Sequence, residues 1–246
     1  MTVLVTGFPA GAFAANCYLV APAPGEECVI IDPGQDAQRG IEELLDRYRL
    51  KPIAVLLTHG HIDHMWSVAP VCGAKGIPAY IHPDDREMLT DPAKGMSLLA
   101  EQLFGGFRGV APPGQQSLGG MTFSEPDEVK ALEDGGIVPL AGLDFRVGHT
   151  PGHTPGSVTF RSTSETPGGH DDLDALFTGD LLFAGSIGRT DLPGGDHATI
   201  LRSLARTLTL PDATVVLPGH GPTTTIGDER QTNPFLTGLK PAQKGM

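Results

Sequence analysis

The amino-acid sequence predicts an α+β fold, a four-layer αββα sandwich that forms a single domain over residues 1–246. Two halves of the chain are rich in short apolar strands, and each half also contains helical patterns, so two sheets can each be covered by helices. The length allows one substantial core, and no linker divides it.

The first half begins as a β-meander and continues as a β-α-β passage. Apolar runs at Val3 to Phe8, Cys17 to Ala21 and Cys28 to Ile31 are separated by Gly, Pro and Asn, which favours paired strands. Apolar residues then recur at helical spacing from Ile41 to Tyr48, and Pro52 ends this helix before a strand from Ile53 to Leu57.

The middle of the chain predicts helices and a long excursion. Helical spacing resumes at Met65 to Lys75 and at Met88 to Phe107, where the apolar stripe indicates core packing. Gly105 to Pro126 is rich in Gly and Pro, which predicts a long surface segment and leaves open whether it acts as a lid over a site.

The second half is again rich in strands. It carries a helix near Thr199 to Thr207, and strands are predicted at Ile137 to Leu140, Leu143 to Val147, Val158 to Arg161, Ala175 to Phe177 and Thr214 to Leu217. The polar segment Ser162 to Asp174 is interpreted as a solvated loop, and its His170 as a bystander.

Charge and composition exclude several classes of protein. A net charge of -12 and a pI near 5.0 argue against a nucleic-acid partner. The three cysteines include no CxxC pair, and neither a signal peptide nor a membrane span is predicted, so a cytoplasmic location is expected. The sequence does not indicate the oligomeric state.

The segment Thr58-His59-Gly60-His61-Ile62-Asp63-His64 is the densest group of metal-binding side chains. Imidazole and carboxylate ligate zinc, iron or manganese at neutral pH, and a turn that follows a buried strand can hold them in fixed directions. Because the segment borders a strand end, where α/β folds place their sites, it predicts a metal site.

Three further motifs follow apolar strands and place glycine beside a polar residue. They are the stretch from His149 to Gly156, the strand end at Asp180, and Gly-flanked His220. Each has a plain alternative, since Asp180 could be a helix N-cap and the histidines ordinary loop residues. His153 is favoured over His149 because Gly152 frees its backbone, although spacing does not decide between the two.

Taken in order, THGHIDH, TPGHTPGS, FTGD and PGHG resemble the metallo-β-lactamase fold superfamily over nearly the whole chain. Their spacing, the segment 183–196 and Asn233-Pro234-Phe235 resemble short bacterial glyoxalase II-like proteins. The resemblance implies two divalent ions, with zinc expected and iron or manganese compatible. It implies the ligands His59, His61 and His153 for the first ion, Asp63, His64 and His220 for the second, and a bridging Asp180.

Individual residues distinguish the branches of this superfamily. Flavodiiron relatives carry Glu where this chain has His61, and the lactamases are exported and lack the bridging aspartate, so Asp180 and the missing signal peptide point away from antibiotic hydrolysis. Eukaryotic glyoxalase II continues after PGHG into a helical domain that grips glutathione, whereas this sequence stops soon after that motif, so the resemblance does not imply specificity for glutathione. Arg189 is a candidate to meet a substrate carboxylate, with a surface salt bridge as the alternative, and Arg230 is a weaker one.

The expected function is metal-dependent hydrolysis of a small-molecule thioester of the S-(2-hydroxyacyl)glutathione type, or of an analogue on another low-molecular-weight thiol. Two ions lower the pKa of a shared water towards about 7, and Asp63 would orient the resulting hydroxide. A thiolate, with a parent pKa near about 8.5, leaves without a strong general acid. Asp32 is either a support for the metal ligands or a turn residue.

Three alternatives remain at this point. A persulfide dioxygenase would use one iron held by His59, His153 and Asp180. A binding module stabilised by metal would show no turnover. A phosphodiesterase could use the same metal pair, although the acidic surface weighs against a polynucleotide substrate.

Overall fold

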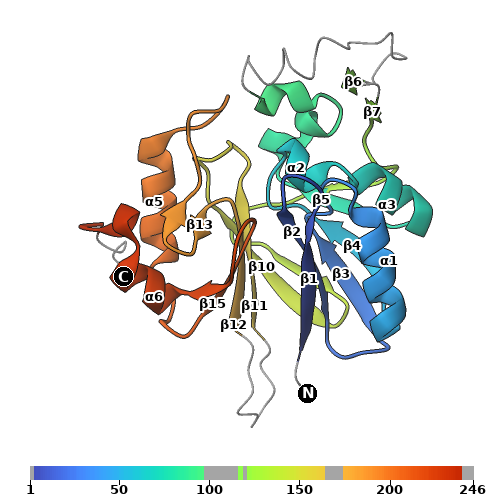
Figure 1. Cartoon of the computed structure of the whole chain (residues 1–246), viewed down its shortest axis with the longest axis horizontal. Helices are drawn as coiled ribbons and strands as arrows, with labels where there is room; N and C mark the ends of the chain where they lie inside the picture. The colour runs from blue at the N-terminus through green and yellow to red at the C-terminus, as the bar shows by residue number, and fades with distance from the viewer. Residues whose placement is uncertain (1–2, 97–115, 119–120, 164–173, 240–246) are drawn as a thin grey trace.

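The computed structural model describes residues 3–96, 116–118, 121–163 and 174–239. Two six-stranded sheets form the centre of the molecule (Figure 1). The first has the strand order β1 (Leu4–Ala10), β2 (Ala15–Ala21), β3 (Glu27–Ile31), β4 (Lys51–Leu56), β5 (Ala79–Ile81) and β8 (Val129–Ala131). The second has the order β16 (Thr224–Thr225), β15 (Val215–Pro218), β12 (Asp174–Gly179), β11 (Val158–Thr163), β10 (Leu143–His149) and β9 (Ile137–Leu140).

Helices cover the outer face of each sheet, as Figure 1 shows. Against the first sheet lie α1 (Ala37–Tyr48) and α3 (Val68–Lys75), whose buried side chains share one apolar cluster with its strands. Against the second lie α5 (His197–Thr207) and α6 (Ile226–Thr232). The predicted four-layer αββα sandwich in a single domain is therefore confirmed.

Besides the apolar clusters under the helices of each sheet, a further apolar cluster lies between the two sheets. Ile31 and Leu56 from the first sheet pack with residues from the second, such as Phe160. Alternate side chains of each strand point to opposite faces, so the same strands also contribute to the clusters under the helices. Burial on both faces explains why these strands are continuous apolar runs in the sequence.

The strand directions place several carboxyl ends together. β1, β2 and β3 are antiparallel neighbours, as the predicted meander requires, whereas β3, β4 and β5 are parallel to one another. In the second sheet β12 and β15 are also parallel. The polar motifs that follow β3, β4, β12 and β15 can therefore meet at one edge of the sandwich.

Some predicted elements differ in the structure. The helix expected at Met65 to Lys75 is preceded by a separate short helix α2 (Ile62–Met65), and α3 starts at Val68. The prediction of a helix from Met88 is wrong over the described residues, because short 3-10 helices η1 (Pro83–Leu89) and η2 (Pro92–Gly95) replace it. Pro92 cannot continue a helix through this point. The remainder of that prediction lies outside the described residues.

Short strands account for most of the elements that the sequence did not indicate. These are β5, β8, β16, β6 (Gln116–Leu118), β7 (Met121–Phe123), β13 (Leu182–Phe183) and β14 (Ser186–Ile187), with the 3-10 helix η3 (Pro234–Leu236). The strands β6 and β7 fall within the excursion predicted for Gly105 to Pro126. The rest of the excursion, its suggested role as a lid, and His170 lie outside the described residues.

No helix in the described part of the chain combines the length and the apolar composition that crossing a membrane requires.

Candidate metal centre

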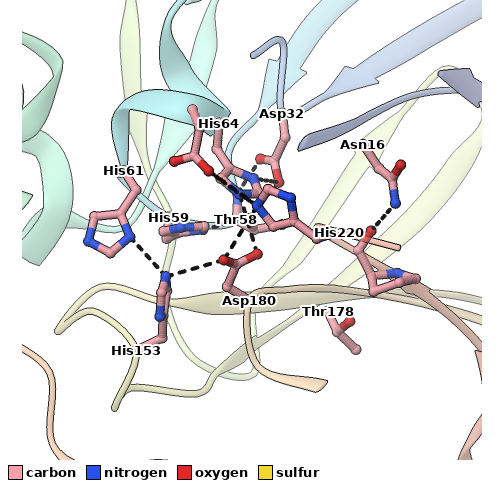
Figure 2. A network of polar contacts seen from close by, with 12 residues as sticks. Asn16, Asp32, Thr58, His59, His61, His64, His153, Thr178, Asp180 and His220 are labelled. Carbon is pink, nitrogen blue, oxygen red and sulfur yellow. Dashed lines mark hydrogen bonds and ion pairs between the residues drawn. The ribbon is translucent and has the colours of Figure 1, made fainter. Parts of the chain in front are cut away.

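Seven side chains from distant parts of the chain converge at the carboxyl ends of the strands (Figure 2). Their ligand atoms form three overlapping groups, within each of which all atoms lie within 4.8 Å of one another. We call His59, His61 and His153 the first metal group, and Asp63, His64 and His220 the second metal group. The remaining group joins His59, His64 and Asp180, so it links the other two.

A chain of hydrogen bonds orients His59. Thr58 Oγ1 donates to Asp32 Oδ2 at 2.6 Å, so Thr58 Oγ1 accepts from His59 Nδ1 at 3.0 Å. His59 Nε2 then carries the lone pair, and this atom is buried without a hydrogen-bond partner. The arrangement is the usual one for a metal-binding histidine, whose other ring nitrogen is held by a neighbouring group.

The same aspartate orients His64. Asp32 Oδ2 lies 3.0 Å from His64 Nδ1, and both side chains are almost fully buried. His64 Nε2 faces the centre, 3.3 Å from Asp180 Oδ1 and 3.3 Å from His220 Nε2. Of the two interpretations of Asp32, support for the metal ligands is the one that this geometry favours.

His153 is held by a backbone carbonyl. Its Nδ1 donates to the carbonyl oxygen of Arg189 at 2.8 Å, which leaves Nε2 to face His61 Nδ1 at 2.8 Å. Gly152, which precedes it, has a φ of +131°, a backbone conformation that residues with a side chain rarely adopt. His149 lies in a separate group with His82 and Asp84, and its Nε2 contacts the carbonyl oxygen of Pro155 at 2.8 Å.

The loop that carries His220 is attached to the first sheet. Asn16 Nδ2 donates to the carbonyl oxygens of Pro218 at 3.0 Å and Gly221 at 2.9 Å. Tyr18 adds a hydrogen bond from its hydroxyl to Pro218 at 2.8 Å. His220 Nε2 then lies 3.1 Å from Asp63 Oδ2, which brings together two members of the second metal group.

The donor set fits divalent metal ions. His59 Nε2 is buried without a hydrogen-bond partner, and an unpartnered buried polar atom is costly. Two imidazole nitrogens at 2.8 Å, as in His61 and His153, direct lone pairs at the same small volume. Imidazole nitrogens and carboxylate oxygens around one volume are the ligands of zinc, iron and manganese.

The pKa values of His59 and His61, in the first metal group, are shifted in the opposite direction to that of His64, in the second. Burial and the neighbouring imidazoles hold the pKa of His59 below its ordinary value and lower that of His61 to about 3. The pKa of His64 is raised, because Asp180 and Asp63 outweigh the opposing effect of burial. Without metal, His59 and His61 therefore present free lone pairs, whereas His64 carries a proton that metal binding must release.

The two carboxyl groups stay ionised. Burial raises the pKa of Asp63, but His64 and His220 outweigh it and hold this pKa below its ordinary value. The pKa of Asp180 is likewise lowered against the effect of its burial, chiefly by His64. Both groups are carboxylates at neutral pH, which is the state that a metal ligand requires.

A cavity of about 470 Å³ opens above the cluster. Its lining includes the candidate ligands His61, Asp63, His153, Asp180 and His220. The rest of the lining is mainly apolar and comprises Phe13, Ile62, Met96, Phe183, Ile187 and Leu192, together with Gly95 and Arg189. An apolar pocket with a few polar groups at its base is typical of a small-molecule site.

The two candidate arginines take different positions. Arg189 lines the cavity, and its exposed guanidinium makes two contacts with Asp191, at 2.7 and 2.6 Å. The salt bridge that was the alternative for Arg189 is thus present. Arg230 donates to the carbonyl oxygens of Leu208 and Leu210, beyond the end of α5, which is a structural role.

Comparison with known proteins assigns the family. A model described as "Metallo-beta-lactamase superfamily" matches residues 10–220, a span that includes all seven converging side chains. This chain belongs to the metallo-beta-lactamase superfamily. Membership supports a metal-dependent hydrolase, and the clustered His and Asp residues are the groups that could hold its metal.

Relatives of this superfamily member extend over almost its full length. An uncharacterized protein of Mycobacterium tuberculosis is 50% identical, covering 96% of this chain and 99% of the relative. A protein of Haemophilus influenzae named hydroxyacylglutathione hydrolase GloC is 34% identical, covering 93% of this chain and 95% of the relative.

Two solved structures are also similar. BLEG-1, named a B3 metallo-beta-lactamase, is 38% identical with a TM-score of 0.76, covering 95% of this chain and 100% of that one. TTHA1623, solved in a di-iron-bound form, is 38% identical with a TM-score of 0.69, covering 96% and 100%.

Several residues that shape the centre were not recognised in the sequence. Asn16 and Tyr18 act through contacts with residues about 200 positions away, which no local pattern reveals. Asp85 is fully buried beside the ligand loops. The available signal for Asp85 was a carboxylate that closely follows a short apolar run, as in the other motifs of this superfamily member.

Proposed function

We propose that this chain is a hydrolase with two divalent metal ions that cleaves a thioester of the S-(2-hydroxyacyl)glutathione type, or its analogue on another low-molecular-weight thiol. The observation that carries the proposal is the pair of three-ligand groups linked through Asp180. The name of the Haemophilus influenzae relative, 34% identical, supports the substrate class.

The proposed ligands follow the two groups. His59, His61 and His153 would hold one ion, Asp63, His64 and His220 the other, and Asp180 would contact both. Zinc suits this mixture of nitrogen and oxygen ligands, as do iron and manganese. Iron deserves equal testing because TTHA1623, 38% identical, was solved with two iron ions.

Bound ions would supply an activated water and polarise the thioester carbonyl. Asp63 faces the cavity as a carboxylate, so it can accept a hydrogen bond from that water and orient it. The Arg189 carbonyl keeps His153 Nδ1 protonated, and the Asp32–Thr58 pair does the same for His59 Nδ1. These contacts keep the opposite ring nitrogens free to bind metal.

The cavity supports a small acyl substrate. Its apolar walls, among them Phe13 and Phe183, would exclude water around the acyl group. Arg189 at the wall offers a cation for a carboxylate on the thiol carrier. A thiolate leaves without help from a strong general acid, so the proposal assigns no residue to that role.

The proposal is tested by thiol release from a panel of acyl thioesters. The panel includes S-lactoylglutathione and lactoyl esters of other thiols. A separate absorbance assay follows ring opening of a β-lactam, because BLEG-1 is named a lactamase. We expect metal-dependent thiol release that Asp63→Ala abolishes while the circular dichroism spectrum is unchanged. Metal-replete wild-type protein that is inactive on every thioester would contradict the proposal.

A mononuclear iron persulfide dioxygenase is the alternative. It would use His59, His153 and Asp180, with His153 Nε2 lying 3.5 Å from Asp180 Oδ2. It leaves the second metal group without a role, which is why the hydrolase is favoured. One iron per chain and oxygen consumption with a thiol persulfide would support the alternative.

A further inference from the structure

Asp85 carries a buried carboxylate that belongs to neither metal group. It lies in η1, which follows β5, and its side chain is fully buried. Burying a carboxylate is costly unless its oxygens accept hydrogen bonds, so its contacts indicate what maintains it there.

Those contacts join two ligand-bearing loops. Asp85 Oδ2 accepts from the backbone nitrogen of Gly60 at 2.9 Å, and Gly60 stands between His59 and His61. From the other loop, Oδ2 accepts from Thr154 Oγ1 at 2.6 Å, and Oδ1 accepts from the backbone nitrogen of Gly156 at 2.7 Å.

The two loops come from different sheets. The first follows β4, and the second connects β10 to β11. The approach of Asp85 is close: a Cβ atom added to Gly156 would lie 2.6 Å from Asp85 Cγ. The carboxylate therefore fixes the distance between the backbone that carries His59 and His61 and the backbone that carries His153.

The three candidate ligands that these loops carry are the members of the first metal group. We propose that Asp85 is a positioning residue that sets the geometry of the first metal group without binding the metal itself. This inference rests on the proposed metal centre. The second metal group has other supports, since His64 is held by Asp32 and the loop of His220 by Asn16.

Asp85→Asn is the sharpest variant, because the side chain keeps its shape. All three neighbours of the carboxylate donate hydrogen bonds to it. The amide of Asn has one acceptor oxygen and an NH2 group, so in either orientation an N–H faces another donor. Asp144→Asn is the control, because Asp144 lies on β10 with an exposed side chain.

The measurement is metal affinity by competition with a chelator, together with the visible spectrum of the cobalt-loaded protein. We expect Asp85→Asn to lower the affinity for one of the two ions by about 10- to 100-fold and to leave the affinity for the other unchanged. The cobalt spectrum should then match that of His61→Ala rather than that of His220→Ala. Asp144→Asn should bind both ions as the wild type does.

Two results would overturn the role of Asp85. One is wild-type affinity for both ions in Asp85→Asn. The other is an equal loss of affinity for both ions, accompanied by a lower melting temperature of the metal-free protein. That result would indicate a general structural role. If Asp85→Asn does not fold, Thr154→Val removes one of the three hydrogen bonds. It should weaken the same ion several-fold, and unchanged affinity would equally count against the proposal.

The wild-type titration separates this inference from the function on which it rests. Fewer than two ions bound to wild-type protein would contradict the proposed dinuclear centre. Two ions in the wild type with an unaffected Asp85→Asn would contradict only the role of Asp85.

Discussion

The carboxylate of Asp32 lies 3.0 Å from His64 Nδ1 and also accepts hydrogen bonds from the backbone and hydroxyl of Thr58. Asp32 has a φ of 50°, which places its backbone in the left-handed region. The side chain thus occupies a buried position where each of its neighbours is a donor. The orientation of both His64 and His59 depends on this one group.

Asp32→Asn should weaken metal binding by about 10- to 100-fold, because the amide cannot accept from all three donors. Chelator competition on the purified variant measures the change. Asp36→Asn, at the start of α1, is a control, because the side chain of Asp36 makes no capping hydrogen bond there. Equal affinities for Asp32→Asn and the wild type would contradict the support assigned to Asp32.

Asn16→Ala should loosen the loop that carries His220. The substitution removes two hydrogen bonds to the backbone of that loop. At about 1 kcal/mol for each bond, the free energy of unfolding should fall by about 2 kcal/mol in urea titrations of the metal-free protein.

The second metal group should also bind its ion less tightly in Asn16→Ala. Tyr18→Phe removes only one hydrogen bond to the same loop and should show about half of the effect on stability. An effect of Asn16→Ala on stability with no effect on metal affinity would show that the loop position does not control His220.

His61 should make the metal-free protein less stable in acid. Its pKa lies at about 3 in the folded protein, through burial and the neighbouring His153, against 6.5 for an unperturbed histidine. Between these values the unfolded chain binds a proton that the folded protein does not. Stability from this residue is therefore present above pH 6.5 and is lost as the pH falls towards 3.

Urea unfolding at pH 7 and pH 5 measures this effect. The wild type should lose about 2 kcal/mol more than His61→Gln between the two values, since 1.5 pH units correspond to that energy. A wild type and a variant with parallel pH profiles would show that His61 titrates normally.

Arg189 and Asp191 test how a charged substrate binds. Their contact is between exposed groups, so it competes weakly with a substrate carboxylate. Arg189→Ala should raise KM several-fold for a thioester whose thiol carries a carboxylate, with little change in kcat. Asp191→Asn should lower that KM, because it frees the guanidinium.

Steady-state kinetics with a charged and an uncharged thioester separate the two effects. Arg39→Ala, on the exposed face of α1, serves as the control. A KM for the charged thioester that Arg189→Ala leaves unchanged would assign Arg189 to the surface salt bridge alone.

Local patterns predicted the long elements and failed for the short ones. The strands near Ile31 and Leu56 are buried on both faces, so they form continuous apolar runs that are visible in the sequence. Strands of three residues, such as β5 and β8, are too short to show a period. The helix expected from Met88 was a misreading of apolar spacing that Pro92 interrupts.

The sequence by itself predicted the fold class and marked the His and Asp motifs as candidate ligands, because apolar periodicity and motif density are local properties of the chain. The choice of seven ligands among these residues came from the resemblance to the superfamily. Only the tertiary structure decided how these groups meet. His61 and His153 are 92 positions apart yet lie at 2.8 Å, and the carboxylate of Asp85 joins loops from two sheets. Such contacts depend on where parallel strands end in space, and residue spacing does not encode that position.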